Sequence, residues 1–188
     1  MRLRACLVPF AALAAFAAPP RPQVAFTTTL GSFTVELAPD AAPRTVANFL
    51  AYVRAGQYPG TTFHRVIATF MIQGGGVTAN GAEKPTRAPI PNEAQAALAK
   101  GWKNTRGTLA MARTSDPNSA TAQFFVNVVD NPFLDYPGQD GWGYCVFGKV
   151  VQGLDTVDRI RAVKTGPEDA PLQPVLITGA RVLGPAGK

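Results

Sequence analysis

The 188-residue sequence has few of the side chains from which most reactive centres are built. One histidine and two cysteines exclude a metal site made of several histidines and a disulfide-rich scaffold. Charged residues make up only 16% of the chain, against roughly 25% on average, which excludes a highly charged disordered protein. No apolar run reaches the roughly 18 residues that a membrane-spanning helix needs. What remains is a chain with 46% apolar residues, long enough for one domain with its own core.

The distribution of charge argues against nucleic acid as a partner. The 18 basic and 12 acidic residues give a net charge of +6, but the basic residues are scattered along the chain. No cluster of five or more basic residues occurs, whereas a nucleic-acid-binding surface concentrates them in a patch or stripe. We therefore expect no nucleic-acid partner.

The first 18 residues have the layout of a secretory signal peptide. Arg2 and Arg4 form a short basic segment, and an apolar stretch over residues 5–16 follows. Residues 15–17 fit the small-x-small pattern of a cleavage site. The alternative is an uncleaved membrane anchor, for which the apolar stretch is short. We predict a cleavable signal peptide at residues 1–18, a periplasmic mature protein, and no membrane association after cleavage.

Cleavage would leave a single cysteine, so the mature chain can form no internal disulfide. Cys6 lies within the predicted signal peptide, and Cys145 lies in the apolar run of residues 144–147. Because this run is apolar, a small buried hydrophobic side chain is a better interpretation of Cys145 than a reactive thiol.

Short strand-like segments dominate the rest of the chain. Alternating apolar residues predict a β-hairpin from residues 24–28 and 33–37. Further strands are predicted at residues 63–67, 70–73, 108–112, 124–129, 145–150 and 175–183. Many short strands without regular β-α alternation predict a mainly β domain over residues 24–184. We expect a closed antiparallel barrel with helices covering its ends.

Helical signals are fewer. One helix is predicted between Asp40, as its N-terminal cap, and Gly56, because apolar residues at 46, 49, 50 and 53 follow helical spacing. A short helix is predicted at residues 92–100, and another around Val157, where apolar residues recur at helical spacing.

Two glycine motifs and the lone histidine carry no clear chemistry. Residues 143–149 match G-x-x-x-x-G-K, but Val150 follows where a phosphate loop needs a hydroxyl. No helix begins after Gly74-Gly75-Gly76, so a tight turn is favoured there over an anion site. His64 is the only histidine, and no serine lies in a G-x-S-x-G motif, which disfavours a hydrolytic triad.

Arg65 is the residue that stands out. Strand alternation places Arg65 on the opposite face from His64, among apolar neighbours. A cation in such surroundings is costly unless it is paired or lies at the mouth of a pocket. The alternative is a rim arginine whose stem packs while its head stays in water. The strand alone leaves both interpretations open.

Several segments taken together resemble the cyclophilin family of peptidyl-prolyl cis-trans isomerases. They are FHRVI at 63–67, FMIQGG at 70–75, MAR at 111–113, AQFFVN at 122–127, NPFLD at 131–135 and VFGKV at 146–150. The resemblance runs from about Phe26 to Leu183, and the signal peptide and loops resemble the bacterial periplasmic branch. It implies an eight-stranded antiparallel barrel closed by two α-helices.

The resemblance also implies a groove for proline-containing peptides of unfolded or exported proteins. The implied catalytic residues are Arg65, Phe70 and Gln73. The implied substrate-binding residues are His64, Met71, Ala112, Arg113, Gln123, Phe125, Phe133, Leu134 and Tyr144. No metal or cofactor is implied. A monomer is expected, because no apolar dimer stripe is evident. A binding module that only holds proline-containing segments remains the alternative to an active isomerase.

Three positions depart from the family pattern. Arg113 stands where many relatives have asparagine, and Tyr144 where many have histidine. Phe133 stands where the eukaryotic cyclophilins that bind cyclosporin tightly have tryptophan. We therefore expect weak cyclosporin binding.

Overall fold

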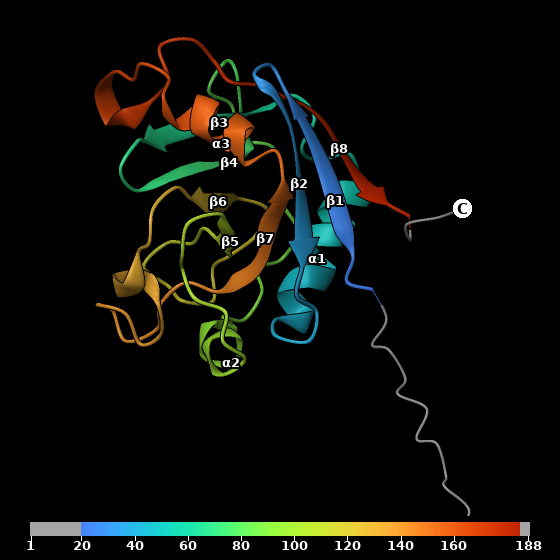
Figure 1. Ribbon diagram of the computed structural model, residues 1–188, viewed down its shortest axis with the longest axis vertical. Coiled ribbons are helices and arrows are strands. Elements are labelled where there is room, and N and C mark those ends of the chain that lie inside the picture. Colours follow the sequence, from blue (N-terminus) through green and yellow to red (C-terminus); the bar gives the residue numbers. More distant parts are fainter. Residues whose placement is uncertain (1–19, 185–188) are drawn as a thin grey trace, which may run out of the picture.

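Residues 20–184 are described by a computed structural model, in which a single antiparallel sheet organises the chain (Figure 1). The strand order is β3-β4-β6-β5-β7-β2-β1-β8. The strands are β1 Gln23–Thr28, β2 Gly31–Leu37, β3 Thr61–Ile67, β4 Met71–Thr78, β5 Thr108–Met111, β6 Phe124–Asn127, β7 Val146–Gln152 and β8 Ile177–Leu183. The predicted mainly β class and the hairpin of β1 and β2 are confirmed.

The sheet curls into a half-barrel whose two end strands are β3 and β8. Thr62 of β3 forms an isolated bridge with Leu176, the residue before β8, and next to it the Phe63 amide donates to the Val175 carbonyl at 2.9 Å. Within residues 20–184, the continuous strand ladders form a curled half-barrel. We expected a closed barrel, but no continuous ladder joins β3 to β8.

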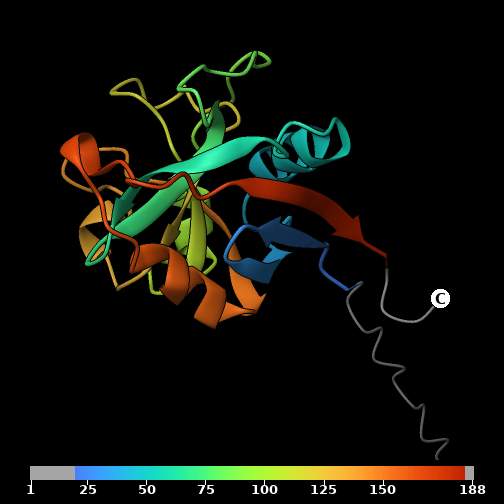
Figure 2. The ribbon, with the colours of Figure 1, turned by 90° about the horizontal axis from the view of Figure 1, so that it is seen from above.

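Three α-helices accompany the sheet in the described residues: α1 Pro43–Arg54, α2 Ala94–Ala99 and α3 Leu154–Arg161. All three agree with the predicted helices, of which those matching α1 and α3 were predicted from apolar spacing. α1 and α3 lie on opposite sides of the curled sheet (Figures 1 and 2). Two short 3-10 helices, η1 Pro132–Leu134 and η2 Pro167–Asp169, lie in the loops.

The predicted cap of α1 is wrong. Its N-cap residue is Ala42, whose side chain offers no hydrogen bond, and Asp40 pairs with Arg21 instead. The Glu93 carboxylate, at the start of α2, accepts the backbone amides of Arg44 at 3.2 Å and Thr45 at 2.8 Å. A distant carboxylate thus satisfies amides that the helix itself leaves unpaired.

The tight turn predicted at Gly74-Gly75-Gly76 is also wrong, because β4 continues through these residues, with a shift in its register against β3. A Cβ atom on Gly75 would lie 2.9 Å from ring atoms of both Phe124 and Tyr58. A Cβ atom on Gly76 would lie 2.4 Å from Cγ of Gln123. These glycines therefore allow β4 to pass close to its neighbours rather than to reverse direction.

The core is aromatic and continuous with the sheet. Eight buried aromatic rings lie within it: Phe26, Phe33, Phe49, Tyr52, Tyr58, Phe63, Phe124 and Phe147. Phe26 stacks on Phe33 with centroids 5.1 Å apart, and Phe49 of α1 meets Phe124 edge-on at 5.8 Å. Ring pairs of this kind stabilise a core beyond the area that they bury, which fixes the sheet against α1.

Cys145 is buried in this core, and burial raises the pKa of its thiol to about 12. The predicted signal peptide, residues 1–18, lies outside the described residues. Within residues 20–184, no helix combines the length and apolar character needed to cross a bilayer.

Candidate active site

Three neighbouring strands bring the predicted residues to one level of the sheet. Gln73 of β4 pairs with Arg65 of β3 on one side and with Phe125 of β6 on the other. Phe125 in turn pairs with Ala110 of β5. Because the strands are in register there, side chains far apart in the sequence share one surface.

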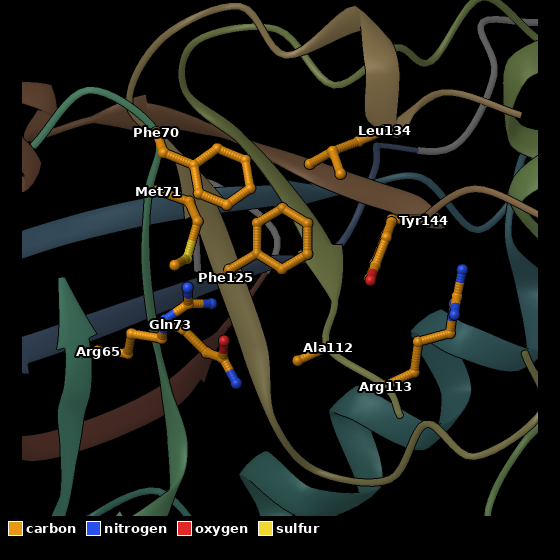
Figure 3. Close-up of a pocket in the computed structure, with 9 residues that line it drawn as sticks. All are labelled: Arg65, Phe70, Met71, Gln73, Ala112, Arg113, Phe125, Leu134 and Tyr144. Carbon is orange, nitrogen blue, oxygen red and sulfur yellow. The ribbon is translucent and has the colours of Figure 1, made fainter. Parts of the chain in front are cut away.

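A cavity of about 130 Å³ opens over this level (Figure 3). Its lining consists of Arg65, Phe70, Met71, Gln73, Ala112, Arg113, Phe125, Leu134 and Tyr144. All nine were predicted as site residues, so the structure brings together nine of the twelve.

The apolar wall of the cavity is preformed. Met71, Phe125 and Leu134 are at most 8% exposed and pack into a small cluster with Ala110 and Val146. This cluster is separate from the main aromatic core. A small apolar ring can therefore be received without rearrangement of the wall.

Arg65 lies at the polar edge of the cavity, and its side chain is 43% exposed. Its Nε donates to Oδ2 of Asp169 at 3.3 Å. The sequence left two interpretations of Arg65 open, a paired cation at the mouth of a pocket and a rim arginine with its head in water. Both describe this side chain, because it is paired with Asp169 and also reaches water. In Figure 3 the side chain extends from β3 toward the cavity.

Two glutamines separate this cavity from an adjoining hollow. Nε2 of Gln73 donates to Oε1 of Gln123 at 3.0 Å. Gln123 does not line the first cavity; it lines the second, of about 250 Å³, together with Gln73, Ala112 and Arg113. The paired amides present donors and acceptors along the surface between the two hollows.

Arg113 and Tyr144, two of the departures from the family pattern, form a single stack. The guanidinium carbon of Arg113 lies 4.2 Å from the centre of the Tyr144 ring. The Arg113 side chain is only 3% exposed, forms an ion pair with Asp140, and donates from Nη2 to the Gly143 carbonyl at 2.9 Å. The hydrogen bond from Arg113 lowers the pKa of Asp140 to about 2.

The remaining two predicted residues lie outside the cavity lining. Phe133 is 46% exposed and stacks on Phe70 at 5.6 Å, at the rim. His64 is half-buried, and its Nδ1 has no hydrogen-bond partner within the described residues. Burial lowers the pKa of His64, which favours the neutral imidazole.

Sequence reasoning missed the two acidic partners, Asp169 and Asp140. Asp169 is 104 residues from Arg65 along the chain, and no local pattern marks it. Within residues 20–184, no group of three or more His, Cys, Asp or Glu side chains is placed to hold a metal ion.

Comparison with known proteins gives consistent matches. Residues 23–182 match the family described as "Cyclophilin type peptidyl-prolyl cis-trans isomerase/CLD". A peptidyl-prolyl cis-trans isomerase of Streptomyces antibioticus is 54% identical, with 86% of this chain and 98% of the relative covered. Peptidyl-prolyl cis-trans isomerase B of Escherichia coli is 53% identical, with 85% and 99% covered.

Solved structures agree with these relatives. A cyclophilin-type isomerase of Cryptosporidium parvum superposes with a TM-score of 0.71 at 26% identity, covering 88% of this chain and 99% of that one. A second structure of that protein, determined in the presence of the dipeptide Ala-Pro, gives a TM-score of 0.70 at 26% identity, with 87% and 99% covered. From the family match and the level of identity, the chain belongs to the cyclophilin-type peptidyl-prolyl cis-trans isomerases, enzymes that interconvert the cis and trans forms of X-Pro bonds.

Proposed function

We propose that this isomerase works through Arg65, which donates a hydrogen bond to the prolyl nitrogen of a twisted X-Pro amide. The observation that carries the proposal is the position of a guanidinium at the edge of a preformed apolar cavity. In this arrangement the ring of proline occupies the cavity while the bond before it rotates beside Arg65.

Amide chemistry explains why a donor in this position accelerates rotation. Resonance makes the C–N bond planar and sets a barrier of about 18–20 kcal/mol. When the bond twists, resonance is lost and the prolyl nitrogen regains a lone pair that can accept a hydrogen bond. A guanidinium is always protonated and only donates, so it binds this nitrogen in the twisted state alone. The interaction therefore stabilises the transition state selectively.

One hydrogen-bond donor can supply most of the required lowering of the rotation barrier. Raising a rate from about 0.01 to about 10 per second is roughly a thousandfold, or about 4 kcal/mol. A single preorganised donor aimed at a transition state contributes roughly 3–4 kcal/mol. Arg65 can supply most of the acceleration without a covalent intermediate.

The other lining residues hold the substrate. Met71, Phe125 and Leu134 receive the proline ring, and Phe70 helps to keep water away from the rotating bond. Exclusion of water matters because water stabilises the planar amide through its carbonyl. Gln73, supported by Gln123, holds the backbone of the peptide. Arg113 and Tyr144 form the opposite wall, and Ala112 leaves room for the chain between the hollows.

The substrates that we propose are proline-containing segments of unfolded or exported proteins. Residues 1–18 support this proposal, because their basic and apolar pattern is that of a secretory signal peptide. The mature enzyme then acts in the periplasm as a monomer. We further propose that the bridge between Thr62 and Leu176 closes the barrel in solution, and that Phe133 at the rim makes cyclosporin binding weak.

Replacement of Arg65 by alanine tests the catalytic proposal. The cis-to-trans rate of a short X-Pro peptide is followed at about 10 °C, where the uncatalysed reaction takes minutes. Arg65→Ala should lower kcat/KM by about tenfold to a thousandfold. Arg106→Ala is a matched control, because Arg106 is 41% exposed and paired with Asp158, much as Arg65 is with Asp169. Circular dichroism verifies that each protein is folded.

The same experiment addresses the alternative of a module that only binds proline-containing segments. A folded wild type without isomerase activity would support the binding module. An Arg65→Ala variant as active as the wild type would exclude the role proposed for Arg65.

A further inference from the structure

The carboxylate beside Arg65 belongs to a short turn between α3 and β8 that backbone hydrogen bonds hold closed. Thr165 and Pro171 form an isolated antiparallel bridge at its base. The Leu172 amide donates to the Lys164 carbonyl at 2.9 Å, and the Gly166 amide to the Ala170 carbonyl at 2.8 Å. The turn is thus closed by its own backbone, and its tip is η2, which contacts β3.

The tip of the turn has an unusual backbone. Glu168 and Asp169 both have φ of 59°, in the left-handed region that residues other than glycine seldom adopt. Two such residues in succession persist only where the surrounding structure holds them. Their effect is to place the Asp169 carboxylate against Nε of Arg65, at 3.3 Å, while Glu168 remains exposed.

We propose that Asp169 is a positioning residue for isomerisation, which orients the guanidinium of Arg65 through its Nε. The inference rests on the proposed function of Arg65. An arginine has five N–H donors, and the contact with Asp169 uses the one on Nε. The Nη1 and Nη2 donors stay available to the prolyl nitrogen.

Orientation matters here because the Arg65 side chain is 43% exposed and long. An unanchored arginine samples many rotamers, and catalysis depends on a donor that is already aimed when the amide twists. A carboxylate on a turn that backbone hydrogen bonds hold closed restricts those rotamers. The pair is itself accessible to solvent, with Asp169 44% exposed, so its effect is modest and sensitive to salt.

Replacement of Asp169 by asparagine is the direct test. Asparagine tolerates the left-handed backbone and removes only the charge. We expect Asp169→Asn to lower kcat/KM by about two- to fivefold, the range of an exposed ion pair. Glu168→Gln is the matched control, because it removes the same charge from the adjacent residue, which forms no ion pair within residues 20–184. Asp169→Gly, also compatible with the backbone, should repeat the loss.

Salt separates positioning from a structural effect. Between about 20 mM and about 1 M salt, screening should bring the wild-type kcat/KM down toward that of Asp169→Asn, whereas the Glu168→Gln control should follow the wild type. Equal activity of Asp169→Asn and Glu168→Gln at low salt would overturn the inference. A ratio of wild type to Asp169→Asn that does not change with salt would overturn it as well.

A double-mutant cycle links Asp169 to Arg65 and separates the two proposals. In the Arg65→Ala background, assayed at higher enzyme concentration, Asp169→Asn should have no further effect. A loss of the same size in both backgrounds would show that Asp169 acts independently of Arg65. If Arg65→Ala is slow but Asp169→Asn matches its control, only the positioning role fails. If Arg65→Ala is as fast as the wild type, both proposals fail.

Discussion

The Arg113 guanidinium carbon lies over the Tyr144 ring, 4.2 Å from its centre, and that ring meets Phe125 of the cavity wall in a T-shaped pair with centroids 5.8 Å apart. Two positions that depart from the family pattern are therefore one structural unit. Through Asp140 and the Gly143 carbonyl, Arg113 ties the loop that follows β5 to the loop that precedes β7. Replacing either residue should therefore change how much the other contributes to the free energy of unfolding.

We predict that Arg113→Ala lowers the free energy of unfolding by about 2–3 kcal/mol, because it removes a desolvated cation–π contact and the partly buried hydrogen bonds to the Gly143 carbonyl. Arg87 is the control, since it lies over Tyr52 at 5.5 Å but is exposed, and Arg87→Ala should cost less than about 1 kcal/mol. Urea unfolding of Arg113→Ala, Tyr144→Ala and the double variant measures the coupling. Additive effects of the two changes would contradict the stack as a unit.

His64 should make stability depend on pH. Burial lowers its pKa in the folded protein, so the unfolded chain binds the proton more readily. Stability should therefore fall as the pH drops from about 7 through the ordinary histidine pKa of about 6.5, and level off below the folded pKa. Urea unfolding at several pH values should show this slope in the wild type and its absence in His64→Gln. As the only histidine, His64 also gives a single imidazole titration in NMR spectra, and a midpoint at or above about 6.5 would refute the prediction.

Cys145 should be inert in the folded enzyme. Its thiol is buried, and burial raises its pKa to about 12, so almost no thiolate forms near neutral pH. With Cys6 replaced by serine, a thiol reagent should modify no cysteine in the native protein and one in urea. Rapid modification of the native protein would show that this part of the core opens readily.

Gly75 should tolerate no side chain. Gly75→Ala adds a Cβ atom 2.9 Å from rings of Tyr58 and Phe124, at a φ of +89°. We expect a loss of about 2–4 kcal/mol in the free energy of unfolding, from overpacking and backbone strain together. Gly81 is the matched control, because it has φ of +83° with nothing within 4 Å of an added Cβ. Gly81→Ala should lower the free energy of unfolding only by the cost of backbone strain, about 1 kcal/mol. Equal losses at both positions would rule out a steric clash of the added Cβ atom at Gly75.

Local patterns were enough to predict the helices and most of the strands, with the second half of β4 as the exception. Apolar spacing located α1 and α3, a capping residue and a following glycine located α2, and alternation located the β1–β2 hairpin. Nine of the site residues that the resemblance implied line one cavity. They come together because the strand register places Arg65, Gln73 and Phe125 side by side.

Partners that lie far apart along the chain could not be predicted. Asp169 meets Arg65 across 104 residues, and Asp140 meets Arg113 across 27. Each depends on a loop conformation that no periodicity encodes. The run of glycines at 74–76 was misread for a related reason, because the need for a bare backbone arises from Tyr58, Phe124 and Gln123, which approach it only in the folded protein.

The carboxylate of Glu93 makes the start of α1 a long-range contact. Thr45 is almost fully buried, and its amide and hydroxyl both donate to Glu93 at 2.8 Å. Until residue 93 is in place, the first turn of α1 lacks these hydrogen bonds and frays. We therefore expect the first turn of α1 and the residues around Glu93 to gain order together, because these hydrogen bonds need both regions in place.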